Sequence, residues 1–191
     1  MSTLTVTHVT PEEYLAAERL SETRSEYLDG GVFPMPGGSL NHNQITTNLI
    51  LELGTQLRAG HCRVLGMDLK VRMPDSRKFF YPDVVVVCDE PQFHDDRKDV
   101  ILNPVLVIEV LSKSTEAFDR GAKFGAYRTV ESLMEYLLVA QDRPAVEQYV
   151  RNADGKWTLA EAAGLESSLM LPSINCTLSL NAVYDKVDFN S

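Results

Sequence analysis

The chain has 191 residues, a formal net charge of −9 at pH 7, and 44% hydrophobic residues. This length fits one domain, so we expect a single domain over residues 1–191 with its core at about 10–160. No apolar run is long enough to span a bilayer, and the N-terminus lacks the basic and apolar regions of a signal peptide. The acidic balance argues against a surface that binds nucleic acid all over, although it leaves room for a local basic groove.

The three cysteines, Cys62, Cys88 and Cys176, are odd in number and far apart in the sequence. Such spacing matches neither a disulfide framework nor a zinc knuckle. We therefore expect free thiols in a reducing compartment and predict a cytoplasmic protein.

Capping and turn signals define the elements that we expect in the N-terminal half. Thr10 and Glu13 can form a capping box with Pro11 at the first helical position, which predicts a helix to about Leu20. The segment 29–31, Asp-Gly-Gly, predicts the turn of a hairpin. The other elements expected here are a helix at about 42–58 capped by Asn41 or Ser39, strands at 62–64 and 67–73, and a polar turn at 74–79.

Two short β-branched runs, one in 79–87 and one beginning at Pro104, predict strands that are buried on both faces. A charged surface loop is expected between them, and Asp119 is expected to cap a third helix at about 120–130. The remaining predicted elements are strands at 135–140, 145–150 and 156–160, a short strand near 169, and a helix at about 180–187. This order predicts an α+β fold, a central mixed β-sheet flanked by helices, with a parallel crossover after the second apolar strand.

Each of the two apolar strands carries one carboxylate: Asp83 directly follows Pro82, and Glu109 lies within an otherwise apolar run. A charge in a buried strand is costly unless it is paired, hydrogen-bonded or bound to a cation. If the strands pair, the carboxylates converge at one edge of the sheet and predict a Mg²⁺ (or Mn²⁺) site, with the Val110 carbonyl as a further oxygen ligand. The plainer alternatives are that Asp83 caps backbone groups and that Glu109 forms a structural ion pair with Lys123.

A site directed at phosphate also needs a cation. Arg120, Lys123 and Tyr127 share one stripe of the expected third helix, whose first turns can return over the carboxylates. Lys123 is our candidate for orienting the attacking water or offsetting charge on the phosphate. A lone lysine of this kind is most often a solvated helix residue.

The Pro82-Asp83 pair followed by Glu109-Val110-Leu111 resembles the metal-site motif of the PD-(D/E)XK nucleases, the restriction endonuclease-like superfamily. More closely, the chain resembles the Uma-type endonuclease family in six ordered segments that reach from about residue 11 to residue 139. They are EYLDGG, GGSLNH, YPDVVVV, PVLVIEVLSKST, the D-x-x-x-K ending at Lys123, and EYLLV.

This resemblance implies a restriction endonuclease-like core that hydrolyses DNA with Mg²⁺ or Mn²⁺. It favours catalytic roles for Glu26 and His42, which lie in matching segments and otherwise read as a cross-strand charge and a helix-start residue. The superfamily usually has a lysine two residues after the second acid, where this chain has Leu111. The resemblance implies that the lysine has moved to Lys123, with Lys113 as a nearby competitor.

Two classes of function stay open. One is a magnesium-dependent endonuclease; the other is a non-catalytic nucleic-acid-binding or interaction protein that keeps the fold, which Leu111 and the acidic surface favour. The presence of Asp83, Glu109 and Lys123 favours the endonuclease. A metal-dependent hydrolase of a small phosphate ester is a third possible function. By analogy with the superfamily we expect a homodimer, because cutting both strands of a duplex needs two sites related by symmetry.

Overall fold

The structure is a computed structural model, and it describes residues 8–66 and 68–189. Its helices are α1 (Pro11–Glu18), α2 (Leu40–Leu57), α3 (Glu116–Phe118), α4 (Phe124–Tyr127) and α5 (Leu180–Val183), with a π-helical turn η1 (Asp119–Lys123) between α3 and α4. None of the helices in this part of the chain combines the length and the apolar character that crossing a bilayer requires.

The strands form one five-stranded, one six-stranded and one two-stranded sheet within the described residues. The five-stranded sheet has the order β2 (Gly31–Pro34), β1 (Ser25–Leu28), β5 (Lys78–Phe80), β4 (Lys70–Arg72), β7 (Val100–Ile101). The six-stranded sheet has the order β11 (Trp157–Ala163), β10 (Ala145–Arg151), β9 (Glu135–Ala140), β8 (Leu106–Leu111), β6 (Val84–Cys88), β3 (Cys62–Leu65). The last sheet pairs β12 (Ser168–Leu171) with β13 (Cys176–Ser179).

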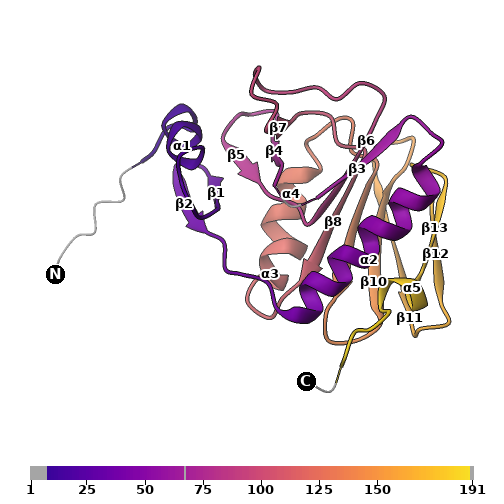
Figure 1. Cartoon of the computed structure of the whole chain (residues 1–191). Coiled ribbons are helices and arrows are strands. Elements are labelled where there is room, and N and C mark those ends of the chain that lie inside the picture. Colours follow the sequence, from indigo (N-terminus) through magenta and orange to yellow (C-terminus); the bar gives the residue numbers. More distant parts are fainter. Residues whose placement is uncertain (1–7, 67, 190–191) are drawn as a thin grey trace.

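The N-terminal helix and hairpin follow their local sequence signals. Thr10 and Glu13 form the predicted capping box of α1, which ends at Glu18, slightly before the expected end. In the β1–β2 turn, Asp29 and Gly30 both have positive φ, 48° and 95°, as a two-residue hairpin turn of this hand requires. Figure 1 shows α1 and this hairpin at one end of the molecule, so the hairpin flanks the larger sheet.

The six-stranded sheet is covered on both faces, as the apolar runs predicted. In β6, Val84 and Val86 belong to one apolar cluster with α2, whereas Val85 and Val87 belong to a second cluster with α4. The same alternation continues in β8 and β9, because successive strand residues point to opposite faces. A mixed sheet flanked by helices is therefore confirmed, and Figure 1 shows the long α2 crossing one face of it.

The predicted parallel crossover is also confirmed. Strand β8 pairs antiparallel with β6 and parallel with β9, and the helical segment α3–η1–α4 connects β8 to β9. Within β8, the alternation places residue 109 on the face that this helical segment covers. The chain order alone therefore brings the third helix over the buried Glu109.

Three expectations for short segments are wrong. The expected polar turn at 74–79 ends in strand β5, because Phe79 and Phe80 are buried and pair with β1 and β4. The expected charged loop contains β7, whose two apolar residues pair in parallel with β4. Strand β13 was not predicted, and the expected strand 67–73 contains only β4, with Met67 outside the described residues.

The third helix begins earlier than predicted. It starts at Glu116, and Asp119 lies inside it, buried, instead of capping it. The π-helical turn η1 adds a residue to one turn and breaks the expected stripe. Arg120 consequently pairs with Glu116 and Glu147, away from Lys123.

The expectation of free thiols is wrong for two of the three cysteines. Cys62 in β3 and Cys88 in β6 lie directly opposite each other in the antiparallel register and form a disulfide. Their separation of 26 residues gave no hint of this contact, because it depends on the pairing of two strands. Cys176 remains free and buried.

We expect the disulfide to stabilise the fold by about 3 kcal/mol, since it closes a loop of this length in the unfolded chain. Reductant should lower the urea midpoint of the wild-type protein and leave that of the Cys62→Ser, Cys88→Ser double variant unchanged. Three alkylated thiols in denatured protein that was never reduced would contradict the bond.

Candidate active site

Asp83 immediately precedes β6, Glu109 lies in the adjacent strand β8, and the strand alternation places both on the same face of the six-stranded sheet. Strand β6 stops pairing with β8 at the Val84–Ile108 pair. The Oδ2 atom of Asp83 then accepts the backbone N–H of Val110 at 2.7 Å, replacing the next backbone partner. Asp83 therefore does cap a backbone group, and the same contact fixes its position beside Glu109.

The ammonium group of Lys123 lies among three carboxylates. Its Nζ atom is 2.9 Å from Oε1 of Glu109, 3.0 Å from Oε1 of Glu26 and 3.6 Å from Oδ1 of Asp119. The side chain is 5% exposed, and Nζ also lies over the Phe80 ring. The structural ion pair between Glu109 and Lys123 is present, and it is part of a larger charged cluster.

Glu26 reaches this cluster from the N-terminal hairpin. Its Oε1 atom accepts the backbone N–H of Tyr81 at 3.1 Å, just before Asp83 in the chain. The Tyr81 hydroxyl in turn donates to Glu18 at the end of α1, so α1 and β1 are both tied to the segment that carries Asp83. Glu26 is therefore anchored from two directions, unlike an ordinary exposed cross-strand charge.

His42 approaches Asp83 from the opposite face of the sheet. It lies in the first turn of α2, which Ser39 caps, and its Nε2 atom is 3.3 Å from Oδ2 of Asp83. A Cβ atom on Gly38 would lie only 2.8 Å from Nδ1 of His42, so the absence of a side chain there lets the ring take this position. The Asp83 hydrogen bond and the charges of Asp83 and Asp119 outweigh burial and raise the pKa of His42.

Three of these carboxylates keep one oxygen unengaged. In Asp83, Glu109 and Glu26, every contact found among residues 8–66 and 68–189 falls on a single oxygen. All three acids line one open cleft of about 780 Å³. The sequence-predicted residues Glu26, His42, Asp83, Glu109, Val110 and Lys123 all line this cleft.

Comparisons with known proteins identify the family of this chain. A family model described as "Putative restriction endonuclease", Uma2, matches residues 11–182. The chain belongs to the Uma2 family. It is 38% identical to the uncharacterized protein sll1609 of Synechocystis sp., over 82% of this chain and 88% of that one. It is 37% identical to slr1290 of the same organism, also uncharacterized, over 95% of this chain and 94% of that one.

One solved structure shows the same fold as this Uma2 chain. It is a crystal structure titled as a putative nuclease belonging to DUF820 from Anabaena variabilis, with a TM-score of 0.74 and 16% sequence identity. The match covers 93% of this chain and 98% of that one. The expected restriction endonuclease-like fold is thereby confirmed, and so is the family resemblance noted in the sequence.

The carboxylates around Lys123 outnumber this one cation. Burial raises the pKa of Glu109 well above its ordinary range, and the charge of Lys123 only partly opposes this. Burial likewise raises the pKa of Asp119. Burial alone would lower the pKa of Lys123, but the charges of Glu109, Glu26 and Asp119 outweigh it and raise that pKa. Three carboxylates contact this one lysine, so the cluster carries a net negative formal charge when all of them are ionised.

The donor set fits a hard divalent cation such as Mg²⁺. Carboxylate oxygens are its preferred protein ligands, and one or two carboxylates usually suffice because waters complete the shell. The N–H and C=O of one strand residue point to the same side, so the Val110 carbonyl faces Asp83 as its N–H does. Within the described residues, no three acids or histidines of this site bring ligand atoms within 4.8 Å of one another, because Lys123 lies between the acids.

Two site residues were missed or assigned to another role in the sequence. Asp119, expected as a cap, is a buried member of the cluster. Tyr127, which the sequence placed on the stripe of Lys123 without a role of its own, donates its hydroxyl to Oε1 of Glu109 at 3.3 Å. The D-x-x-x-K segment pointed to Asp119, whereas helical spacing alone did not indicate that Tyr127 contacts Glu109.

We expect Lys123→Met to destabilise the fold by about 3–5 kcal/mol at pH 8, since it leaves buried carboxylates without their cation. Their pKa values then rise further in the folded state. When a carboxyl group has a higher pKa in the folded state than in the unfolded state, the folded state loses stability as the pH rises through the folded-state pKa. The difference in free energy of unfolding between the variant and the wild type should therefore be smaller at pH 5 than at pH 8. Urea unfolding at both pH values measures this, with Lys156→Met, an exposed lysine of the β10–β11 turn, as the control.

An equal deficit at pH 5 and pH 8 would contradict the charge explanation. It would indicate that Lys123 contributes through the packing of its stem.

Proposed function

We propose that this Uma2 protein is an endonuclease that hydrolyses DNA phosphodiester bonds with Mg²⁺ or Mn²⁺ at the Asp83–Glu109 site. The observation that carries the proposal is that Asp83, Glu109 and Glu26, each with one unengaged oxygen, line one cleft together with the buried Lys123. The excess of carboxylate charge supports a cation there, and the family description and the fold support nuclease chemistry. The cleft, at about 780 Å³, lies within the range of about 300–1,000 Å³ that is typical of ligand sites, and it is open to solvent.

We assign metal binding to Asp83, Glu109 and the Val110 carbonyl. A divalent cation bound there would supply a water of lowered pKa and offset charge on the phosphate. The Val110 N–H and the His42 ring hold Oδ2 of Asp83, which leaves Oδ1 of this cleft-lining residue available. Tyr127 similarly restrains Glu109 from behind.

Lys123 is our candidate for the catalytic cation, in preference to Lys113. It touches Glu109 directly, and packing in the helix fixes its stem. Its contact with Asp119 is the longest of the three, at 3.6 Å, so this is the N–H group that can turn most easily to a water or a phosphate oxygen. Lys113 does not line the carboxylate cleft. His42, 3.3 Å from Asp83, is placed to accept or donate a proton within the cleft.

Two further parts of the proposal rest on analogy with nucleases of this fold. We propose a homodimer, which would place two equivalent sites on a duplex; sedimentation equilibrium measures this directly. The alternative function is a non-catalytic protein that binds nucleic acid with the same cleft, favoured by Leu111 in the usual lysine position and by the net charge of −9.

Calorimetry with Mn²⁺ tests the metal site. We expect one site per chain in the wild-type protein and loss of binding in the Asp83→Asn, Glu109→Gln double variant, which keeps the side-chain shapes. The matched control removes two exposed acids that line neither cleft, Asp154→Asn and Glu161→Gln. Equal binding by the wild type and the site variant would contradict the assignment.

A plasmid nicking assay with Mg²⁺ or Mn²⁺ tests the reaction. We expect Asp83→Ala to be inactive, and Lys123→Met to lose on the order of a hundredfold or more in rate, as removal of a stabilising donor typically costs. Lys113→Met should cut at a rate much closer to that of the wild type when DNA is saturating. A folded Lys123→Met protein with wild-type activity would overturn the lysine assignment, and a wild type that cleaves no DNA with either metal would leave the non-catalytic alternative.

A further inference from the structure

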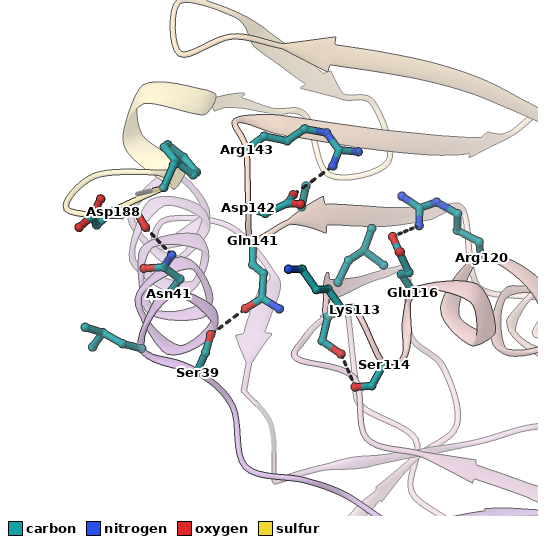
Figure 2. A pocket seen from close by; sticks show the side chains of 15 residues that line it. Ser39, Asn41, Lys113, Ser114, Glu116, Arg120, Gln141, Asp142, Arg143 and Asp188 are labelled. Carbon is teal, nitrogen blue, oxygen red and sulfur yellow. Dashed lines mark hydrogen bonds and ion pairs between the residues drawn. The ribbon is translucent and has the colours of Figure 1, made fainter. Parts of the chain in front are cut away.

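A second cavity adjoins the carboxylate cleft. It has a volume of about 460 Å³, and Figure 2 shows the side chains that line it. Ser39, Ser112, Ser114 and Gln141 line both cavities, so the two spaces meet along these polar residues. Its walls come from the start of α2, the loop after β8, and the turn after β9.

Lys113 supplies the available positive charge of this second cavity. It is exposed, and among residues 8–66 and 68–189 no ion pair or hydrogen bond engages its ammonium group. Figure 2 shows its side chain extending toward Gln141. The other two cations in the wall are already paired: Arg120 with Glu116 and Glu147, and Arg143 with Asp142.

Neutral donors surround the same space. Gln141 accepts a hydrogen bond from Ser39 on its amide oxygen, which leaves its NH₂ group as a donor. The hydroxyl of Ser112 lies 3.0 Å from that of Ser114 and 2.9 Å from that of Thr115. A lysine with amide and hydroxyl donors is the kind of set that binds phosphate oxygens in nucleic-acid complexes.

The two cavities differ in charge. Five acids and two cations with permanent charge line the carboxylate cleft, whereas three acids and three cations line the second cavity. Two of the three acids in the second cavity, Glu116 and Asp142, are neutralised by the paired arginines. The third acid, Asp188, accepts a hydrogen bond on its backbone carbonyl from Asn41 at the start of α2, on the other side of the cavity from Glu116 in Figure 2.

We propose that the second cavity binds a neighbouring phosphodiester of the same DNA strand whose scissile phosphate lies in the carboxylate cleft, with Lys113 and Gln141 as its main contacts. This inference rests on the proposed function, because it assigns the path of that substrate. Lys113 then contributes affinity and register, whereas Lys123 acts on the reacting group. When one DNA strand spans both cavities, binding of its phosphate in the second cavity offsets the repulsion between the strand and the acidic carboxylate cleft.

Binding to duplex DNA tests the subsite without turnover. Fluorescence anisotropy in Ca²⁺ at several salt concentrations, with gels to confirm that the duplex stays intact, gives the slope of log affinity against log salt. One phosphate contact contributes about 0.9 to that slope on duplex DNA, so Lys113→Met should reduce it by about that amount and weaken binding. Lys156→Met, which removes an exposed lysine outside both cavities, should match the wild type.

Kinetics on substrates of two lengths test the position of the contact. Bis(p-nitrophenyl) phosphate has one phosphate and cannot reach both cavities, whereas duplex DNA can. We expect Lys113→Met to lower the ratio of kcat/KM for DNA to kcat/KM for the small diester. Most of this change should come from a higher KM for DNA. Gln141→Leu should act in the same direction.

The outcomes separate this inference from the proposed function. If the wild type cuts DNA and Lys113→Met keeps the wild-type salt slope and KM, the subsite is wrong and the nuclease assignment stands. If no DNA is cut but binding still depends on Lys113, the nuclease assignment fails and the phosphate subsite is supported. A wild type that neither binds nor cuts DNA overturns both.

Discussion

The site depends on one buried ammonium group held among carboxylates from three separate parts of the chain. Glu26 comes from the N-terminal hairpin, Glu109 from the central sheet and Asp119 from the third helix, and all three surround Lys123. Breaking one member of such a buried set is costly, because the remaining charges lose their partner. The cluster therefore links the folding of the hairpin, the sheet and the helix to the geometry of the site.

Much of this arrangement was accessible from the sequence because it depends on local patterns. The β-branched runs predicted the two central strands, and two acids placed in such runs predicted that charge would be buried. The strand–helix–strand order predicted that the helix carrying Lys123 would return over the sheet. The EYLDGG and GGSLNH segments directed attention to Glu26 and His42 through family resemblance alone, since neither residue stands out by periodicity.

The features that the sequence did not reveal depend on contacts between distant segments. The disulfide requires Cys62 and Cys88 to lie opposite each other in two strands separated by 26 residues. Strand β7 is two residues long and is stabilised by its neighbours in the sheet, so no local pattern marks it. The role of Asp119 depends on burial within the helix, whereas its residue type suggested a cap.

The π-helical turn η1 gives the helix a register that a regular α-helix would not have. Each residue of an α-helix turns the chain by about 100°, so removing the extra residue from this turn would rotate the two parts of the helix against each other by about that angle. Lys123 or the aromatic residues after it would then face away from the sheet. Short insertions and deletions between 119 and 123 are consequently far less tolerable than substitutions there, and the spacing in the D-x-x-x-K segment is a requirement of geometry as much as of residue type.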